Sequence, residues 1–225
     1  LKVDFFVEYP FDMEFSKLSG NEFVENVLKN KFNCKAIVIG SGFAFGKNRM
    51  WDANAMAEIS HKSGIETYIM PHELLDGEKV SSTDIRNFIK EGNIGAANNL
   101  MGHNYFIEGV VTHGEGRGHK LGFPTINIIT GNEKLLPANG VYATKTYFGG
   151  AVAQSITNVG NNITFDKVAT RVETFLIDFD GDLYGKPVKI EFLKFLREER
   201  KFENANALIE QINIDIEKRK GSNDD

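Results

Sequence analysis

The first hundred residues alternate between short apolar runs and segments in which apolar residues recur at helical spacing. Residues 36–39 are all apolar, mostly β-branched and followed by Gly40, which is typical of a buried parallel strand. Residues Glu66–Met70 predict a second strand, and Ala53–Lys62 between them predicts a helix. Strands that alternate with helices in this way predict an open α/β sheet.

Two polar clusters in this half mark helix starts. Ser19 and Glu22 have the spacing of a capping box, and Val24 and Val27 after them share one helix face. The second cluster can bind phosphate through the free N–H groups of a helix N-terminus. An ordinary helix cap with a surface arginine explains the same residues, and the segment taken alone favours this interpretation. These candidate residues are Ser81, Ser82, Thr83 and Arg86.

From about residue 103 the pattern changes to short strands separated by turn residues. Strands are predicted at 107–111, 140–147, 151–159, 168–179 and 188–195. Regularly spaced strands of this kind predict an antiparallel barrel or sandwich. We therefore expect two domains, an α/β domain over residues 1–102 and a β-barrel domain over residues 103–225.

A closing helix is predicted after the last strand, with its apolar face directed at the domain core. That face consists of Leu208, Ile209, Ile212 and Ile216. The residues from Lys218 onward are polar, and we expect them to fray.

Composition and charge narrow the classes of partner. With 41% hydrophobic and 25% charged residues, the chain resembles an ordinary soluble protein. Its net charge of -5 argues against a broad nucleic-acid interface. No apolar run approaches the roughly 18 residues of a membrane span, and the single cysteine, Cys34, fits a reducing compartment. We expect a cytoplasmic protein that binds small molecules, neither nucleic acid nor membrane, as a monomer or weak homo-oligomer.

The stretch 114–122 contains four glycines and predicts an anion-binding loop. Glycines let successive backbone N–H groups turn toward one point, and phosphate is the common anion of that shape. An ordinary glycine turn remains the alternative at this stage. The candidate phosphate-binding residues are Gly114, Gly116, Arg117, Gly118, His119 and Lys120.

Thr125 and Asn127 follow this loop at a spacing of two. In an extended segment both side chains point to the same side. A hydroxyl and an amide oxygen can ligate a hard cation such as Mg²⁺, which accompanies phosphates. Together with the loop, the two residues predict a site for a nucleoside triphosphate and its cation.

Glu173 is the candidate general base. By alternation it shares a strand face with Phe175 and Ile177. A carboxylate on an apolar face is costly unless it is paired, and such groups are candidates for catalysis. The alternative is a glutamate at the barrel rim paired with an arginine, and the alternation favours neither interpretation.

Several segments, in order, resemble the motifs of riboflavin kinases. The stretch 116–127 resembles their glycine-rich loop and Pro-Thr-Ala-Asn motif, with Ile126 at the alanine position. The other matching segments are Gly-Val-Tyr-Ala at 140–143, Asn-Val-Gly at 158–160, Val-Glu-Thr at 172–174, Asp-Leu-Tyr-Gly at 182–185 and Leu-Arg-Glu-Glu-Arg-Lys-Phe at 196–202. The first half resembles the end of the FMN adenylyltransferase domain that bacterial bifunctional FAD synthetases fuse to this kinase.

The resemblance implies a partial Rossmann-like nucleotidyltransferase domain followed by a six-stranded antiparallel Greek-key barrel with a C-terminal helix. It implies transfer of a phosphoryl group from ATP, with Mg²⁺, to riboflavin to give FMN. Glu173 would act as base, Thr125 and Asn127 would hold the metal, and the flavin would contact Arg197, Phe202 and Tyr184. A flavin- or nucleotide-binding barrel without catalysis is the alternative function.

In the first half, residues 80–86 resemble the family's Ile-Ser-Ser-Thr-x-Ile-Arg segment, which implies ATP binding by Ser81, Ser82, Thr83 and Arg86. The family's adenylyltransferase also uses a His-x-Gly-His motif, which this sequence lacks. We therefore expect residues to precede Leu1 in the intact protein, and we expect FAD to be made only when they are present.

Overall fold

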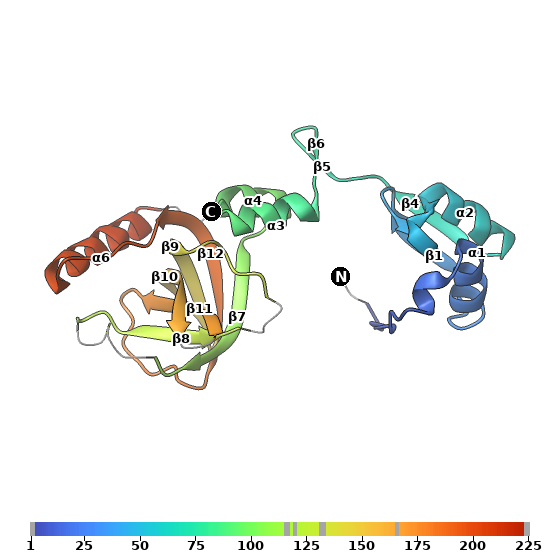
Figure 1. Cartoon of the computed structure of the whole chain (residues 1–225). Coiled ribbons are helices and arrows are strands. Elements are labelled where there is room, and N and C mark those ends of the chain that lie inside the picture. Colours follow the sequence, from blue (N-terminus) through green and yellow to red (C-terminus); the bar gives the residue numbers. More distant parts are fainter. Residues whose placement is uncertain (1–2, 115–117, 119–120, 131–133, 165–166, 223–225) are drawn as a thin grey trace. The chain divides into compact units, whose positions relative to one another are not determined.

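The computed structural model describes residues 3–114, 118, 121–130, 134–164 and 167–222, without side chains at Glu78 and 161–170. The chain forms two compact units, and the division falls between Val80 and Ser81 (Figure 1). This division lies before the two short helices Ser82–Lys90 and Ile94–Met101, which the expected boundary at residue 102 places in the first domain. Each unit is described by itself.

The first unit contains a two-stranded parallel sheet of β1 (Ala36–Gly40) and β4 (Glu66–Met70), with Ala36 opposite Glu66 and Gly40 opposite Met70. The expected capping box is confirmed, because Glu22 N donates to Ser19 Oγ at 3.3 Å and Ser19 N donates to Glu22 Oε2 at 2.8 Å. The remaining elements are η1 (Phe15–Lys17), α1 (Gly20–Glu22), η2 (Phe23–Lys29), β2 (Ala44–Phe45), η3 (Lys47–Arg49), β3 (Trp51–Asp52), α2 (Ala53–Lys62), β5 (Leu74–Leu75) and β6 (Glu78–Lys79).

The predicted helix is present with both Val24 and Val27 buried, whereas the prediction for the first strand was wrong in part. The helix after the capping box is a π-helix, in which Asn30 N donates to Glu25 O five residues back. The first strand is not buried on both faces, because Val38 is 67% exposed. Only the face with Ile37 and Ile39 packs against the small core of this unit.

The second unit is a closed barrel of six antiparallel strands, in the order β10-β11-β8-β7-β12-β9. The strand β8 lies beside β11 although β9 and β10 intervene in sequence, which is the Greek-key arrangement that was expected. The strands are β7 (Tyr105–Thr112), β8 (Thr125–Ile129), β9 (Gly140–Phe148), β10 (Ala151–Thr164), β11 (Lys167–Leu176) and β12 (Pro187–Arg197).

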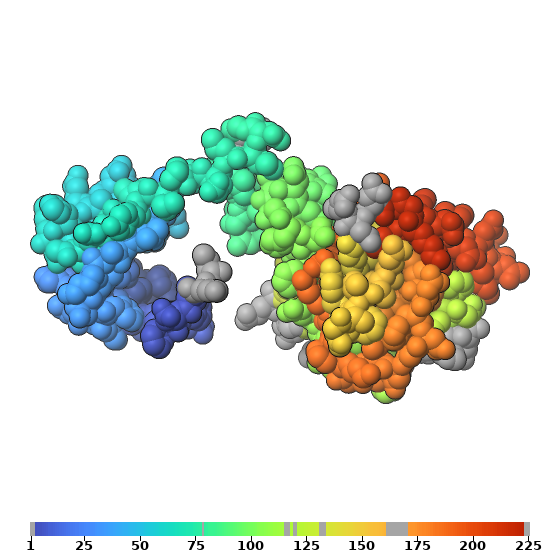
Figure 2. Space-filling model, turned by 180° about the vertical axis from the view of Figure 1, so that it is seen from behind, coloured from blue at the N-terminus to red at the C-terminus, as the bar shows by residue number. Residues whose placement is uncertain are grey.

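The helices α3 (Ser82–Lys90) and α4 (Ile94–Met101) belong to the barrel unit, against which they lie in Figures 1 and 2. Ile89, Ile94 and Ala97 are buried in the same core as the barrel strands. Asn98 ties α4 to the barrel, since its Nδ2 donates to the Phe192 carbonyl at 2.9 Å. The compact unit therefore begins about twenty residues earlier than the expected boundary because these helix faces are buried against the barrel core.

A ladder of hydroxyl groups crosses the barrel interior among the apolar residues. Thr144 Oγ1 lies 2.7 Å from Ser155 Oγ and 2.9 Å from Thr157 Oγ1. Thr157 also meets Thr174 Oγ1 at 2.9 Å, and Ser155 meets Thr146 Oγ1 at 2.8 Å. Each of these side chains is fully buried and has a partner, so the barrel tolerates the polar groups.

The last helix, α6 (Ala205–Lys220), covers part of the outer barrel surface and is red in Figure 1. The expected fraying was wrong for residues 218–220, because Arg219 is buried and its Nε donates to the Thr144 carbonyl at 2.9 Å, while residues 223–225 lie outside the described part of the chain. The fully buried stripe of this helix is polar and consists of Gln211, Asp215 and Arg219, whereas the predicted apolar residues Leu208 and Ile212 are half-buried beside it.

Candidate active site

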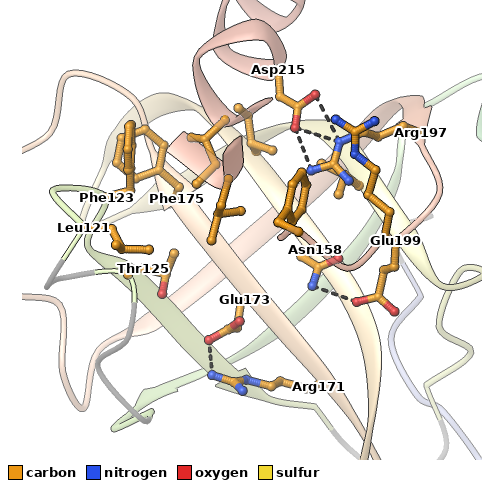
Figure 3. A pocket seen from close by; sticks show the side chains of 17 residues that line it. Leu121, Phe123, Thr125, Asn158, Arg171, Glu173, Phe175, Arg197, Glu199 and Asp215 are labelled. Atoms are coloured by element: carbon orange, nitrogen blue, oxygen red, sulfur yellow. Dashed lines mark hydrogen bonds and ion pairs between the residues drawn. The ribbon is translucent and has the colours of Figure 1, made fainter. Parts of the chain in front are cut away.

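A cavity of about 440 Å³ opens on the outer surface of the barrel beside α6 (Figure 3). Its walls come from the strands β8 to β12, the loop before β8, the segment after β12 and α6. The lining residues are Gly118, Leu121, Phe123, Thr125, Val141, Ile156, Asn158, Arg171, Glu173, Phe175, Arg197, Glu199, Arg200, Phe202, Leu208, Ile212 and Asp215. The cavity therefore combines apolar walls with convergent polar groups, as small-molecule sites do.

The register of the barrel strands aligns four polar residues and one valine in a single row across the barrel surface. Asn127 of β8 is opposite Glu173 of β11, and Glu173 is opposite Asn158 of β10. On the same row, Asn158 is opposite Val141, and Val141 is opposite Arg197. Directly opposed residues share a face of the sheet, so residues distant in sequence meet at one site.

Arg171 connects the two residues expected to do chemistry. Its Nη2 donates to Glu173 Oε1, and its Nε donates to Asn127 Oδ1 at 3.1 Å. The side chains of Arg171 and Glu173 are 22% and 24% exposed, so the ion pair is largely shielded but still borders the cavity. Glu173 is therefore paired with an arginine and also lines the cavity, so the pairing does not decide between the two interpretations of this residue.

The glycine-rich loop approaches the expected cation ligands at two of its described glycines, Gly114 and Gly118. A Cβ on Gly114 would collide with the Asn127 side-chain amide, and a Cβ on Gly118 would collide with the Phe123 carbonyl and lie 3.4 Å from Thr125 Oγ1. The absence of a side chain at these two positions is therefore what lets the loop pack here. Gly116, Arg117, His119 and Lys120 lie outside the described residues.

The other expected site residues divide into two groups. Arg197 and Phe202 line the cavity, but Tyr184 does not. Tyr184 instead stacks on His113 with ring centroids 3.8 Å apart, and it is 48% exposed. The structure thus does not bring Tyr184 together with Arg197 and Phe202.

The cluster at the start of α3 has the geometry of a helix cap. Ser81 Oγ accepts a hydrogen bond from Thr83 N at 3.2 Å, and Arg86 Nη1 donates to Ser82 O and Ser82 Oγ, both at 3.2 Å. All three hydrogen bonds are local to the start of this helix. All four residues belong to the barrel unit.

Sequence reasoning missed several residues of the cavity. Arg171 was detectable in principle, because it stands two residues before Glu173 and so shares its strand face. Asp215 lines the cavity and Gln211, which contacts it, does not; the two recur at a spacing of four, but polar residues at that spacing ordinarily form the solvent face of a helix. The other polar lining residues that were missed are Asn158, Glu199 and Arg200.

Within the described part of the chain, no three His, Cys, Asp or Glu side chains gather as a metal-binding cluster would. Among those same residues, no helix is long and apolar enough to cross a membrane.

Comparisons with known proteins match the two parts of the chain to two different family models. A flavokinase family model, described as riboflavin kinase, matches residues 101–222, and an FAD synthetase model matches residues 1–84. The bifunctional riboflavin kinase/FMN adenylyltransferase of Listeria monocytogenes is 35% identical over 96% of this chain and 68% of its own length. The corresponding protein of Bacillus subtilis is 35% identical over 91% of this chain and 65% of its own length.

A solved structure is also similar. The crystal structure described as a macrolide-efflux protein from Streptococcus pneumoniae has a TM-score of 0.86 and 30% identity, covering 95% of this chain and 68% of that chain. The chain spans about two thirds of the length of the relatives it matches.

Proposed function

Because this chain belongs to the bifunctional riboflavin kinase/FMN adenylyltransferase family, we propose that its barrel unit transfers the γ-phosphoryl group of ATP to riboflavin. The observation that carries the proposal is the juxtaposition of Glu173 and Asn127 in one row, with the glycine-rich loop packed against Asn127 and Thr125. Phosphoryl transfer needs positioning and charge neutralisation more than covalent help, and this arrangement supplies groups for both.

The phosphate end of ATP is assigned to the glycine-rich loop. Backbone N–H groups there, from Gly114 to Gly118, would hold the phosphate oxygens. Arg117, His119 and Lys120 follow in the same stretch and would add positive charge or hydrogen-bond donors.

Mg²⁺ is assigned to Thr125 and Asn127. The donor set fits a hard cation, because a hydroxyl, an amide oxygen and the nearby Glu173 carboxylate are all oxygen ligands. Asn127 Oδ1 accepts from Arg171, so a cation would compete with the guanidinium for that oxygen. When bound, the ion would neutralise charge on the phosphoryl oxygens.

Glu173 is assigned the role of general base. Its carboxylate would take the proton of the ribityl 5′-hydroxyl while that oxygen forms a bond to the γ-phosphorus. The bond from the γ-phosphorus to the bridging oxygen breaks at the same centre, and ADP leaves with that oxygen. Arg171, beside Glu173, would face the negative charge of the transferred group.

The flavin is assigned to the opposite end of the cavity. The isoalloxazine ring is flat and largely apolar, and Phe202 offers an aromatic wall there, whereas Phe175 lies opposite Thr125 in the strand register. Arg197 and Arg200 border the same end and can donate hydrogen bonds to ring carbonyls. Tyr184 has no part in this assignment, because it lies outside the cavity.

The first unit is assigned to FMN adenylyltransferase activity, which would convert FMN to FAD. The FAD synthetase match over residues 1–84 supports this assignment. Ser81, Ser82, Thr83 and Arg86 remain the proposed ATP contacts of that reaction. With ATP as co-substrate and flavins as substrate and product, we place the protein in the cytoplasm as a monomer or weak homo-oligomer.

The test is incubation of this chain with riboflavin, ATP and MgCl₂, followed by chromatographic separation of flavins. We expect FMN to accumulate. Binding of riboflavin without FMN formation would support the alternative of a non-catalytic flavin-binding barrel and overturn the proposed kinase activity.

A further inference from the structure

The segment after β12, residues 197–202, forms one wall of the cavity and is called the strap here. Arg197, Glu199, Arg200 and Phe202 of the strap all line the cavity. Most of the strap lies outside regular secondary structure, so side-chain contacts must fix its position. On the β10 side, Asn158 Nδ2 donates to Glu199 Oε1 at 2.9 Å.

On the other side, Asp215 of α6 holds the first arginine of the strap (Figure 3). Arg197 Nε lies 2.9 Å from Asp215 Oδ2 and 3.2 Å from Oδ1, and Arg197 Nη2 lies 2.9 Å from Oδ2. The Asp215 side chain is only 2% exposed. A buried carboxylate needs a charged partner and further hydrogen bonds, and Arg197 supplies the charge.

Gln211 extends the same network to the second arginine. Its Nε2 donates to Asp215 Oδ1 at 2.8 Å, and its Oε1 accepts from Arg200 Nη2. The amide orientation is fixed, because the carboxylate can only accept and the guanidinium can only donate. One turn of α6 therefore holds both arginines through Asp215 and Gln211.

Both arginines in turn contact Phe202. The guanidinium carbons of Arg197 and Arg200 lie 5.7 Å and 4.9 Å from the centre of its ring. These are cation–π distances, so the position of the ring depends on where the two arginines are held.

We propose that Asp215 is a positioning residue for the flavin substrate. It fixes Arg197 directly and Arg200 through Gln211, and the two arginines set the Phe202 ring as a wall of the flavin end. The inference rests on the proposed riboflavin kinase function. It assigns Asp215 an effect on the flavin and none on ATP, because the strap contacts neither Thr125 nor Asn127 in any hydrogen bond or ring contact described above.

A purely structural role for Asp215, pinning α6 to the barrel, makes a different prediction. The chain offers a matched control in Lys220, whose Nζ lies 3.1 Å from Asp178 Oδ2. That ion pair also joins α6 to a barrel residue, but neither partner lines the cavity. If pinning were the whole role, Asp215→Asn and Lys220→Gln would differ only in how much stability they remove.

The experiment measures riboflavin affinity by quenching of flavin fluorescence, together with the KM of each substrate, in Asp215→Asn, Gln211→Leu and Lys220→Gln. Asp215→Asn should raise the riboflavin Kd and KM by about tenfold, the loss expected for a charge-assisted contact, and leave the KM for ATP within about twofold. Gln211→Leu should raise the riboflavin values by about fivefold, and Lys220→Gln should leave them within about twofold.

Asp215→Asn leaves the Arg197 charge without its partner and can unfold the barrel. Gln211→Leu changes no charge. If Asp215→Asn does not fold, the riboflavin affinity of Gln211→Leu tests the inference instead. Folded variants that bind riboflavin as tightly as the parent chain would overturn the inference while leaving the kinase proposal intact. A parent chain that neither binds nor phosphorylates riboflavin would overturn the kinase proposal and the inference with it.

Discussion

The two units of this chain use their strands in opposite ways. In the first unit, the sheet of β1 and β4 packs against the core with one face only. On its other face, Val38 and Tyr68 are 67% and 53% exposed. In the second unit, the barrel closes on itself, and Ile107, Ile190 and Phe192 are fully buried. Closure removes the unpaired strand edges that a two-stranded sheet retains.

The comparison shows where a binding site can be built. Parallel strands are ordinarily buried on both faces, and one face of the first unit's sheet is uncovered within that unit. The closed barrel, by contrast, holds its strands in a fixed register, and that register aligns Asn127, Glu173 and Asn158. A rigid element of this kind can keep catalytic groups in place.

The largest expected effect is on the free energy of unfolding, which core substitutions should lower far more in the barrel unit than a strand substitution lowers it in the first unit. Phe192 packs against Tyr105 and Tyr142, with ring centroids 6.2 Å and 5.3 Å away. Phe192→Ala should destabilise the barrel by about 3–5 kcal/mol, whereas Val38→Ala in the first unit should cost less than about 0.5 kcal/mol. Denaturant titrations followed by circular dichroism would measure both.

The single tryptophan, Trp51, allows the units to be followed separately, because it lies in the first unit. Its fluorescence transition should stay unchanged in Phe192→Ala while the circular dichroism transition moves to lower denaturant. A parallel shift of both signals would show that the two units unfold as one and would remove the contrast.

The next effect concerns catalysis in the barrel. Glu173→Gln keeps the size of the side chain but cannot accept the proton, so kcat for FMN formation should fall by at least about 100-fold, with little change in ATP affinity. Initial rates at saturating riboflavin and ATP measure this.

The matched control is Glu191→Gln. Glu191 forms an ion pair with Lys189, two residues before it on the same strand, and Lys189 Nζ lies 2.6 Å from Glu191 Oε1. Glu173 and Arg171 are paired at the same spacing. Unlike Glu173, Glu191 does not line the cavity. Burial opposes ionisation of Glu191, yet hydrogen bonds from Lys189 and Tyr147 hold its pKa below the ordinary value. Equal losses in the two variants would assign the Glu173 effect to a broken ion pair.

A smaller effect is expected at the proposed cation ligands. Thr125→Ala or Asn127→Ala should raise the Mg²⁺ concentration for half-maximal rate by about tenfold. The control is Gln154→Ala, which removes an amide side chain elsewhere on the barrel surface. Unchanged metal titrations in both variants would remove the two residues from the metal site.

The smallest effect contrasts two threonines. Thr157 hydrogen-bonds Thr144 and Thr174 inside the barrel, so Thr157→Val should cost about 1–2 kcal/mol. Thr67 Oγ1 in the first unit is buried without a hydrogen-bond partner among the described residues. Thr67→Val should therefore leave the stability of its unit unchanged or raise it slightly, as Trp51 fluorescence would show.

Patterns along single segments predicted the elements well, while relations between segments had to come from the structure. The capping box at Ser19 and the strand alternation around Glu173 depend only on neighbours in sequence, and both are observed. The row from Asn127 to Arg197 depends on the register between strands, which alternation along each strand cannot supply.

Burial was the second limit. The α6 stripe of Gln211, Asp215 and Arg219 resembles a solvent-facing pattern, and only the buried partners Arg197 and Thr144 explain why it faces inward. The compact units divide before α3 rather than after α4 for the same reason, because the helical pattern of these two segments does not show their contacts with the barrel core.

The central claim is that the barrel binds both substrates at the row containing Glu173. A crystal structure of this chain with ADP, Mg²⁺ and riboflavin tests it most directly. We expect the ribityl 5′-oxygen within about 2.6–3.2 Å of the Glu173 carboxylate, with the ADP phosphates on the glycine-rich loop beside Thr125. Riboflavin and ADP bound at a surface remote from both Thr125 and Glu173 would contradict the account.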